Sequence, residues 1–192
     1  EFRFALDNQL RESLTNCGAV VEEERRMEIL QYVERFRTAY NTKDINFLQQ
    51  VFSDDALIIT GHVVTTKINE MDPGGQKVVY SKQNKQQYIA NLKRAFARNK
   101  WIDVKFSQIG ENGEAGGCAG ITRSVSDPNK YGVRLRQEWK SSNYSDEGYL
   151  FLLWEFRDGQ SPVVHVRTWQ PEWVGGEKLP ESEIFSLGDF NL

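Results

Sequence analysis

Residues 33–61, VERFRTAYNTKDINFLQQVFSDDALIITG, place two helices and a strand in immediate succession. The first helix ends near Asn41, a residue type that suits the left-handed end of a helix. Asp44 follows three residues later and is a suitable N-cap for a second, short helix. The apolar residues of that second helix are Ile45, Leu48 and Phe52. The stretch therefore predicts a helix, a tight turn and a shorter helix.

A change of period follows this helix pair. Residues 54–68, DDALIITGHVVTTKI, are apolar and β-branched over most of their length, which is typical of a strand. Gly61 lies in the middle of the segment, and we expect a break or bulge there. A glycine-containing loop and the short strand 77–80 come next.

The segment before the quoted stretch predicts that its first helix begins near residue 22. Apolar side chains recur there at helical spacing, and three glutamates crowd the start, where a helix dipole favours negative charge. The apolar positions are Ile29, Val33, Phe36 and Tyr40. Residues 1–21 carry a second, interrupted helical stripe, and we interpret them as a short N-terminal helical extension of a domain that spans 22–192.

The rest of the chain contains one further helix and then strands. Residues 85–99 carry one apolar face, with Ser81 or Asn84 as the cap. Beyond residue 100 the apolar residues alternate, which predicts strands at 101–109, 131–139, 149–156, 163–170 and, less regularly, 183–190. Helices followed by hairpin-linked strands predict an α+β fold. We expect about three N-terminal helices packed on a strongly curved, cone-like antiparallel sheet.

The composition is that of an ordinary globular domain. Of the 192 residues 39% are hydrophobic and 27% are charged, and 24 basic residues against 27 acidic ones give a net charge of −3. A domain that binds duplex nucleic acid carries a basic surplus, so we expect no nucleic-acid partner. No apolar run reaches the roughly 18 residues of a membrane span.

The stretch 33–61 resembles the nuclear transport factor 2-like superfamily. Its long helix, the turn from Asn41 to Asp44, the second helix ending in an aromatic residue and the DDA at 54–56 match the pattern of that family. The resemblance covers roughly residues 22–170 and implies a cone-shaped fold. The family includes isomerases, dehydratases, polyketide cyclases, transport adaptors and many uncharacterised exported bacterial proteins. We therefore expect an exported bacterial protein, in the periplasm or the cell envelope.

The resemblance provides one test for catalysis. Steroid isomerases of this family place a tyrosine five residues before the residue at the turn, and here that position is Phe36, which has no proton to donate. They place a general-base aspartate four residues after the alanine of DDA, and here that position is Thr60, whose hydroxyl is too weak a base near neutral pH. Isomerase chemistry in that form is not expected.

The stretch 165–173, HVRTWQPEW, is the remaining candidate for a site. In a regular strand His165 and Arg167 share a face, and a two-residue hairpin at 158–159 places Leu152 opposite His165 and Leu150 opposite Arg167. A longer loop would slip this register. The polar pair would then either line the pocket or be a histidine bonded within the sheet and an arginine paired with an acid such as Glu155.

Other side chains favour structural interpretations. Trp139, Trp154, Trp169 and Trp173 are typical of a core or of a dimer surface on the sheet, and as the alternative they would form the aromatic wall of a pocket. Asp54 and Asp55 are too few oxygens for a hard cation. Cys17 and Cys118 have no metal-ligand spacing, and whether they pair stays open.

These observations predict a noncatalytic domain that binds a small apolar ligand in the cone or a protein on the sheet, with a homodimer through the sheet. The ligand-binding candidates are Phe36, Tyr40, Thr60, Trp154, His165 and Arg167. The alternative is a small acid–base enzyme of the isomerase or dehydratase type that uses His165 and Arg167. We expect no cofactor and no tightly bound metal.

Overall fold

The computed structural model describes residues 23–66, 69, 71, 74–109 and 120–190. Its helices are α2 (Glu23–Asn41), α3 (Ile45–Val51) and α4 (Lys85–Arg98), with two 3-10 turns, η1 (Glu181–Glu183) and η2 (Leu187–Asp189). Its strands are β1 (Phe52–Thr65), β2 (Gln76–Asn84), β3 (Ile102–Ser107), β4 (Ile121–Arg123), β5 (Lys130–Ser141), β6 (Ser145–Glu155), β7 (Val163–Pro171), β8 (Trp173–Val174) and β9 (Glu177–Lys178). The predicted N-terminal extension, 1–21, and both cysteines lie outside the described residues.

The helices begin where the sequence predicts them. The Asp44 carboxylate accepts a hydrogen bond from the backbone of Phe47 at the start of α3, at 3.1 Å. The cap of α4 is Asn84, which forms a capping box with Gln87. The left-handed residue between α2 and α3 is Lys43, at φ 56°, and not Asn41 as expected. Asn41 extends the helix by one residue instead.

Seven strands form one mixed sheet in the order β2-β1-β7-β6-β5-β3, with β4 also paired to β5. The expectation of an antiparallel sheet is wrong at one junction, because β1 and β7 run parallel. Hairpins join β1 to β2, β5 to β6 and β6 to β7 and make these pairs antiparallel, whereas more than ninety residues separate β1 from β7 and leave their relative direction to packing. The α+β class and the three helices on one sheet are confirmed.

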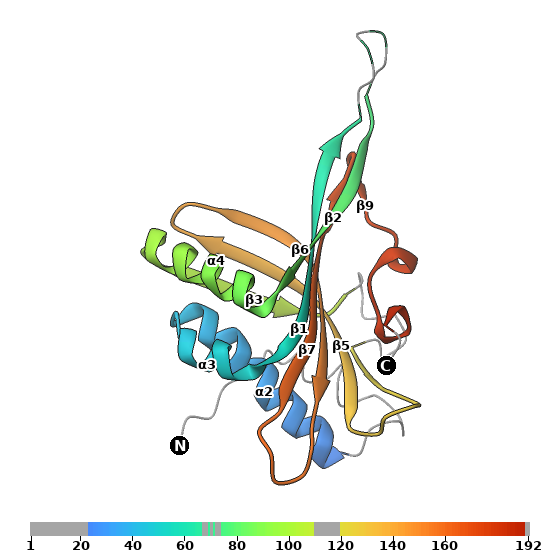
Figure 1. Cartoon of the computed structure of the whole chain (residues 1–192). Coiled ribbons are helices and arrows are strands. Elements are labelled where there is room, and N and C mark those ends of the chain that lie inside the picture. Colours follow the sequence, from blue (N-terminus) through green and yellow to red (C-terminus); the bar gives the residue numbers. More distant parts are fainter. Residues whose placement is uncertain (1–22, 67–68, 70, 72–73, 110–119, 191–192) are drawn as a thin grey trace.

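Strand β1 runs without a break through Gly61, which pairs with Tyr80, so the expected bulge is absent at this position. A side chain there would not fit, because a Cβ atom on Gly61 would lie 2.8 Å from a methyl carbon of Val78. Strands β1 and β2 continue beyond the other strands as a long twisted hairpin that projects from the body of the molecule (Figure 1).

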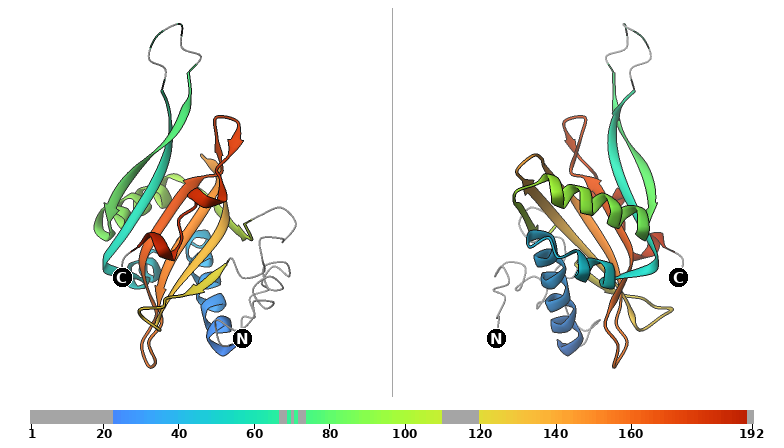
Figure 2. Two further views of the ribbon diagram at one scale, coloured as in Figure 1. Left: turned by 90° about the vertical axis from the view of Figure 1, so that its right-hand side faces the viewer. Right: turned by 60° about the vertical axis from the view of Figure 1, so that its left-hand side comes forward.

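The two faces of the sheet are covered by different parts of the chain. The helices pack on one face around the main core, which includes Phe36, Leu150 and Trp154 (Figure 2). On the opposite face the C-terminal segment covers a smaller cluster formed by Phe151, Leu153 and Val166, and its own contribution comes from Phe185, Leu187 and Phe190. The helices leave this second face uncovered. The predicted homodimer through the sheet would therefore form on this face, part of which the C-terminal segment covers.

The C-terminal segment 183–190 is not a strand, as its pattern suggested. It contains the last residue of η1, three connecting residues and then η2. The side chain of Gln170 on β7 holds it in place. Its amide nitrogen donates to the carbonyl of Glu183 at 2.8 Å, and its oxygen accepts from the backbone of Phe185 at 2.9 Å. A side-chain amide thus takes the role that a neighbouring strand would have.

Candidate functional site

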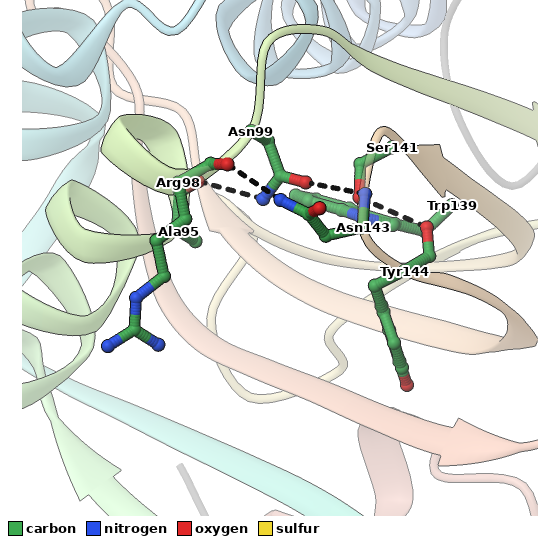
Figure 3. Close-up of a pocket in the computed structure, with 7 residues that line it drawn as sticks. All are labelled: Ala95, Arg98, Asn99, Trp139, Ser141, Asn143 and Tyr144. Atoms are coloured by element: carbon green, nitrogen blue, oxygen red, sulfur yellow. Dashed lines mark hydrogen bonds between the residues drawn. The ribbon is translucent and has the colours of Figure 1, made fainter.

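The helix-covered side of the molecule contains an open pocket of about 550 Å³ between α4 and the hairpin that joins β5 to β6 (Figure 3). The side chains around it come from the end of α4, from the end of β5 and from the turn between β5 and β6. They are Ala95, Arg98, Asn99, Trp139, Ser141, Asn143 and Tyr144. A pocket of this size accommodates a small organic molecule.

Hydrogen bonds fix the hairpin turn against the end of α4. The Asn99 amide nitrogen donates to the carbonyl of Ala95 at 2.8 Å, and its oxygen accepts from the backbone of Asn143 at 3.1 Å. The Asn143 amide donates to the carbonyl of Arg98 at 2.6 Å. The bond from Asn143 also satisfies the carbonyl of Arg98, one of the groups that the last turn of a helix leaves unpaired. These hydrogen bonds hold the β5–β6 turn in a fixed position against the end of α4 beside the pocket (Figure 3).

Two aromatic side chains provide the walls. The ring of Trp139 packs edge-to-face on the ring of Tyr40, with 5.8 Å between the ring centroids, so its position is set by α2. Tyr144 is 58% exposed. Partial burial and the nearby carboxylate of Asp146 raise the pKa of its phenol to about 12. Both walls thus present flat apolar surface to the pocket and have polar neighbours behind them.

Those neighbours belong to a polar group on the helix-covered face of the sheet, which we call the Arg167 cluster: Tyr40, Tyr88, Asp146 and Arg167. The phenol oxygens of Tyr40 and Tyr88 lie 2.6 Å apart and share a hydrogen bond. The Arg167 guanidinium lies over the ring of Tyr88, with its central carbon 5.1 Å from the ring centroid. Burial raises the pKa of Tyr40 well above its ordinary value, so this phenol is neutral near pH 7.

The charge of Arg167 is buried without an ion pair. The residue is 7% exposed, and within the described residues no carboxylate lies within 4 Å of its guanidinium, whose Nε has no hydrogen-bond partner. Burial acts to lower the pKa of Arg167, but its interactions with Tyr88, Tyr40 and Asp146, which include a hydrogen bond to Tyr40, outweigh burial and the pKa is raised. The guanidinium therefore stays charged.

Asp146 is the acidic member of the cluster, and it is also incompletely satisfied. Its Oδ1 is buried without a hydrogen-bond partner among the described residues. Burial raises the pKa of its carboxyl, and the contributions of Tyr144 and Arg167 in the other direction are smaller. An uncompensated charge in such surroundings costs stability, and functional sites are where proteins retain such a cost.

Of the six residues predicted from the sequence, the structure brings Tyr40 and Arg167 together in this cluster. Phe36 and Trp154 lie in the main core, where their rings pack on one another with 6.1 Å between centroids. Thr60 lies within β1, opposite Ser81 on the neighbouring strand β2 and opposite Trp169 on the neighbouring strand β7. A ligand-binding role for these residues stays a prediction.

His165 lies apart from the cluster. Its Nε2 bonds to the carboxylate of Glu155, and its Nδ1 lies 3.9 Å from the carboxylate of Asp55. A bulge between Val164 and Val166 shifts the register of β7 against β6 and turns His165 away from the face that carries Arg167. The expected sharing of a face by these two residues is therefore wrong.

The register itself also differs from the one expected. Leu152, not Leu150, lies opposite Arg167, because the loop between β6 and β7 is longer than two residues. Glu155 bonds to His165 and Arg157 rather than to Arg167. The sequence allowed for a slip of this kind, but it could not place the bulge.

Sequence reasoning missed Asp146, Tyr144 and Asn99 as parts of a site. Tyr88 and Trp139 were visible, as a core position of the third helix and as one of the tryptophans of the sheet. No local pattern marks Asp146, which follows the polar turn SSNYS at 141–145. Arg167 is 21 residues away in the sequence. The two residues interact electrostatically because β6 and β7 are neighbours in the sheet.

The described residues contain no group of three or more His, Cys, Asp or Glu side chains that could hold a metal ion. Among the same residues, no helix combines the length and the apolar character needed to cross a lipid bilayer.

Comparison of the sequence with family models found no match, and comparison with curated proteins found none either. Comparison of the structures did find similar folds. Bd1075 of Bdellovibrio bacteriovorus is 15% identical over 78% of this chain, with a TM-score of 0.54, and the chain spans only 41% of that protein. A nuclear transport factor 2-like protein of unknown function from Pseudomonas putida is 12% identical, with 78% of this chain and 87% of that one covered and a TM-score of 0.52.

A chain of naphthalene 1,2-dioxygenase, with indole bound in its active site, has a TM-score of 0.54 at 9% identity, and 81% of each chain is covered. The helices on one face of a twisted mixed sheet define an α+β cone. This chain has the nuclear transport factor 2-like fold. Because proteins with this fold include an enzyme and proteins of unknown function, the fold does not decide the activity.

Proposed function

We propose that the protein binds a small organic molecule with a flat ring in the pocket between α4 and the β5–β6 hairpin. The observation that supports this most is the pocket itself, about 550 Å³ and walled by Trp139 and Tyr144. Aromatic walls with a few polar groups at one end are the usual composition of small-molecule sites. The proposal includes no catalytic step.

The enzyme alternative based on His165 and Arg167 has no geometric support. A general base and the group that stabilises developing charge must reach the same ligand. His165 contacts Glu155 and Asp55, whereas Arg167 lies against Tyr88. Binding is therefore the function that the arrangement favours. The proposed location, in the periplasm or the cell envelope, rests on the sequence resemblance alone.

The test is a fragment screen by two-dimensional NMR that follows the indole N–H signals. We expect flat aromatic fragments to shift the Trp139 signal in a saturable way. Trp173, in the β8–β9 hairpin, is 51% exposed and serves as the internal control that should not shift. The Trp139 signal is assigned from a Trp139→Phe variant.

A pair of variants on one helix makes the test specific for the pocket. Ala95 lines the pocket, and Ala95→Phe should fill it and abolish the shifts. Ala97 is exposed and does not line the pocket, so Ala97→Phe should leave them unchanged. If no fragment shifts Trp139, or if Ala95→Phe leaves binding intact, the proposal is wrong.

A further inference from the structure

One edge of the sheet is open along the length of a strand. Strand β2 is the last strand in the sheet order, and within the described part of the chain it pairs only with β1. Alternate N–H and C=O groups of its nine residues therefore face outward without a neighbouring strand. Seven of the nine residues are exposed. The edge is thus accessible as well as unpaired.

The other end of the sheet, formed by β3, is covered by side chains of α2. The backbone N–H of Val104 donates to the side-chain oxygen of Asn41 at 2.6 Å. The carbonyl of the same residue accepts from Arg37 at 3.3 Å and from the Asn41 amide at 3.4 Å. Among the described residues no such side chain bonds to the backbone of residues 77–83 on β2. Only the β2 edge is therefore left for a partner.

The position of β2 also leaves room for an added chain. Strands β1 and β2 extend beyond the other strands as a twisted hairpin that projects from the body of the molecule (Figure 2). The parallel pairing of β1 with β7 ends at Thr60, whereas the pairing of β1 with β2 continues to Thr65. A segment that pairs with the outer edge of β2 would meet solvent on its other side.

The side chains of β2 indicate the chemistry of the partner. Val79 and Tyr80 are 44% and 40% exposed and point to opposite faces of the hairpin. Lys77 and Lys82 are exposed, and within the described residues neither has a carboxylate within 4 Å. The stretch 76–84 contains no acidic residue, although the whole chain has a net charge of −3. The open edge is therefore a basic strip with apolar side chains.

This charge argues against a second copy of the chain as the partner. Pairing of two β2 strands would bring the lysines of both copies together, and lysines on an edge strand commonly prevent such self-association. The same lysines attract a partner of opposite charge.

We propose that the outer edge of β2 binds an extended acidic segment of another protein, which adds to the sheet as a further strand. The backbone of the segment pairs with the free groups of β2, and its carboxylates pair with Lys77 and Lys82. No residue of β2 lines the pocket between α4 and the β5–β6 hairpin, so this surface is independent of the proposed small-molecule site.

The first test uses three labelled peptides of the same length as β2, measured by fluorescence anisotropy at fixed ionic strength. One alternates valine and glutamate, the second replaces each glutamate by lysine, and the third keeps the glutamates and replaces each valine by proline. We expect the first to bind at least tenfold more tightly than the second. The third has the same charge but cannot form a strand, so it should not bind.

Hydrogen exchange measured by NMR reports the pairing directly. The outward-facing amides of β2 should exchange at least tenfold more slowly when the valine–glutamate peptide is bound. The amide of Val104, which is already bonded to Asn41, should not change. Binding that leaves the exchange of the β2 amides unchanged would overturn strand addition.

A matched pair of double variants tests the lysines. Lys77→Glu combined with Lys82→Glu should abolish the preference for the acidic peptide. Lys93→Glu combined with Lys140→Glu changes the net charge equally at exposed positions on α4 and β5, and it should alter the affinity by less than threefold. Equal losses in the two double variants would mean attraction by overall charge and would overturn the proposal.

Two further results would contradict it. The first is equal affinity of the wild-type protein for the acidic and the basic peptide. The second is slow exchange of the outward-facing β2 amides in the protein alone that becomes fast on dilution, because the edge would then be occupied by a second copy of the chain.

Discussion

The phenol oxygens of Tyr40 and Tyr88 lie 2.6 Å apart and join α2 to α4 beneath the guanidinium of Arg167. Both residues also belong to the main core, where aromatic rings pack edge-to-face around Phe36 and Phe52. The bond is therefore a polar contact within apolar surroundings, at the place where the core meets the candidate site. The contribution of this bond to the free energy of unfolding can be measured with three variants.

Tyr40→Phe should destabilise the protein by about 1–3 kcal/mol, because the hydroxyl of Tyr88 is left buried without its partner. Tyr88→Phe should have a similar effect. The double variant should cost less than the sum of the two, since it leaves no orphaned hydroxyl. Urea unfolding of the three variants measures this coupling, and strictly additive losses would contradict the bond.

Asp146→Asn should stabilise the protein near pH 7. Burial raises the pKa of Asp146 in the folded state, so the group favours folding below its unfolded pKa of about 3.9, and this contribution is lost as the pH rises through the folded pKa. The substitution removes the cost of the ionised form. Thermal unfolding should therefore show a higher Tm for the variant at pH 7 and no difference near pH 3. A lower Tm of the variant at pH 7 would mean that the ionised carboxylate of Asp146 makes favourable interactions in the folded protein.

Gly148→Ala should disrupt the junction of β6 and β7. The added Cβ would lie 2.4 Å from the carbonyl oxygen of Gln170 and equally close to the Trp169 ring, so backbone and ring must both move. We expect a loss of about 1–3 kcal/mol, the usual range for overpacking. Gly188→Ala is the matched control, because a Cβ atom there meets nothing within 4 Å. Equal unfolding midpoints for the two variants would argue against this close approach.

His165→Gln should lower the free energy of unfolding by about 1 kcal/mol, the usual scale for one hydrogen-bonded side chain, because it weakens the contact with Glu155. Ligand affinity should be unchanged, since His165 does not line the pocket between α4 and the β5–β6 hairpin. Denaturant unfolding and a binding titration on the same sample check both statements. If a folded variant lost ligand binding, or lost turnover of a screened carbonyl compound, His165 would be part of the functional site.

Replacing Phe185, Leu187 and Phe190 by serine should expose the sheet face that these residues cover. The ring of Phe190 stacks on that of Phe151 with 5.5 Å between centroids, and Leu153 and Val166 lie in the same cluster. We expect the variant to sediment as larger species than the wild type at micromolar concentration, since exposed apolar patches drive association. The predicted dimer through the sheet stays a prediction, and equal sedimentation of the two proteins would show that this face is not adhesive.

The sequence determined the elements of this protein. The three helices, their caps at Asp44 and Asn84, and most strands follow from periods of 3.6 and 2 and from local hydrogen bonds within a few residues. The strand predicted at 183–190 is the exception, because Gln170, a residue distant from the C-terminal segment, supplies its hydrogen bonds.

The tertiary structure decided what the sequence left open: the parallel pairing of β1 with β7, the bulge beside His165 and the assembly of the site. Tyr40, Tyr88, Asp146 and Arg167 come from two helices and two strands, and their separations in the chain carry no signal. Periodicity reports which face of an element is buried, whereas the partner of each face depends on strand order and register. For β1 and β7 these are set by packing between distant segments, because no local turn joins the two strands.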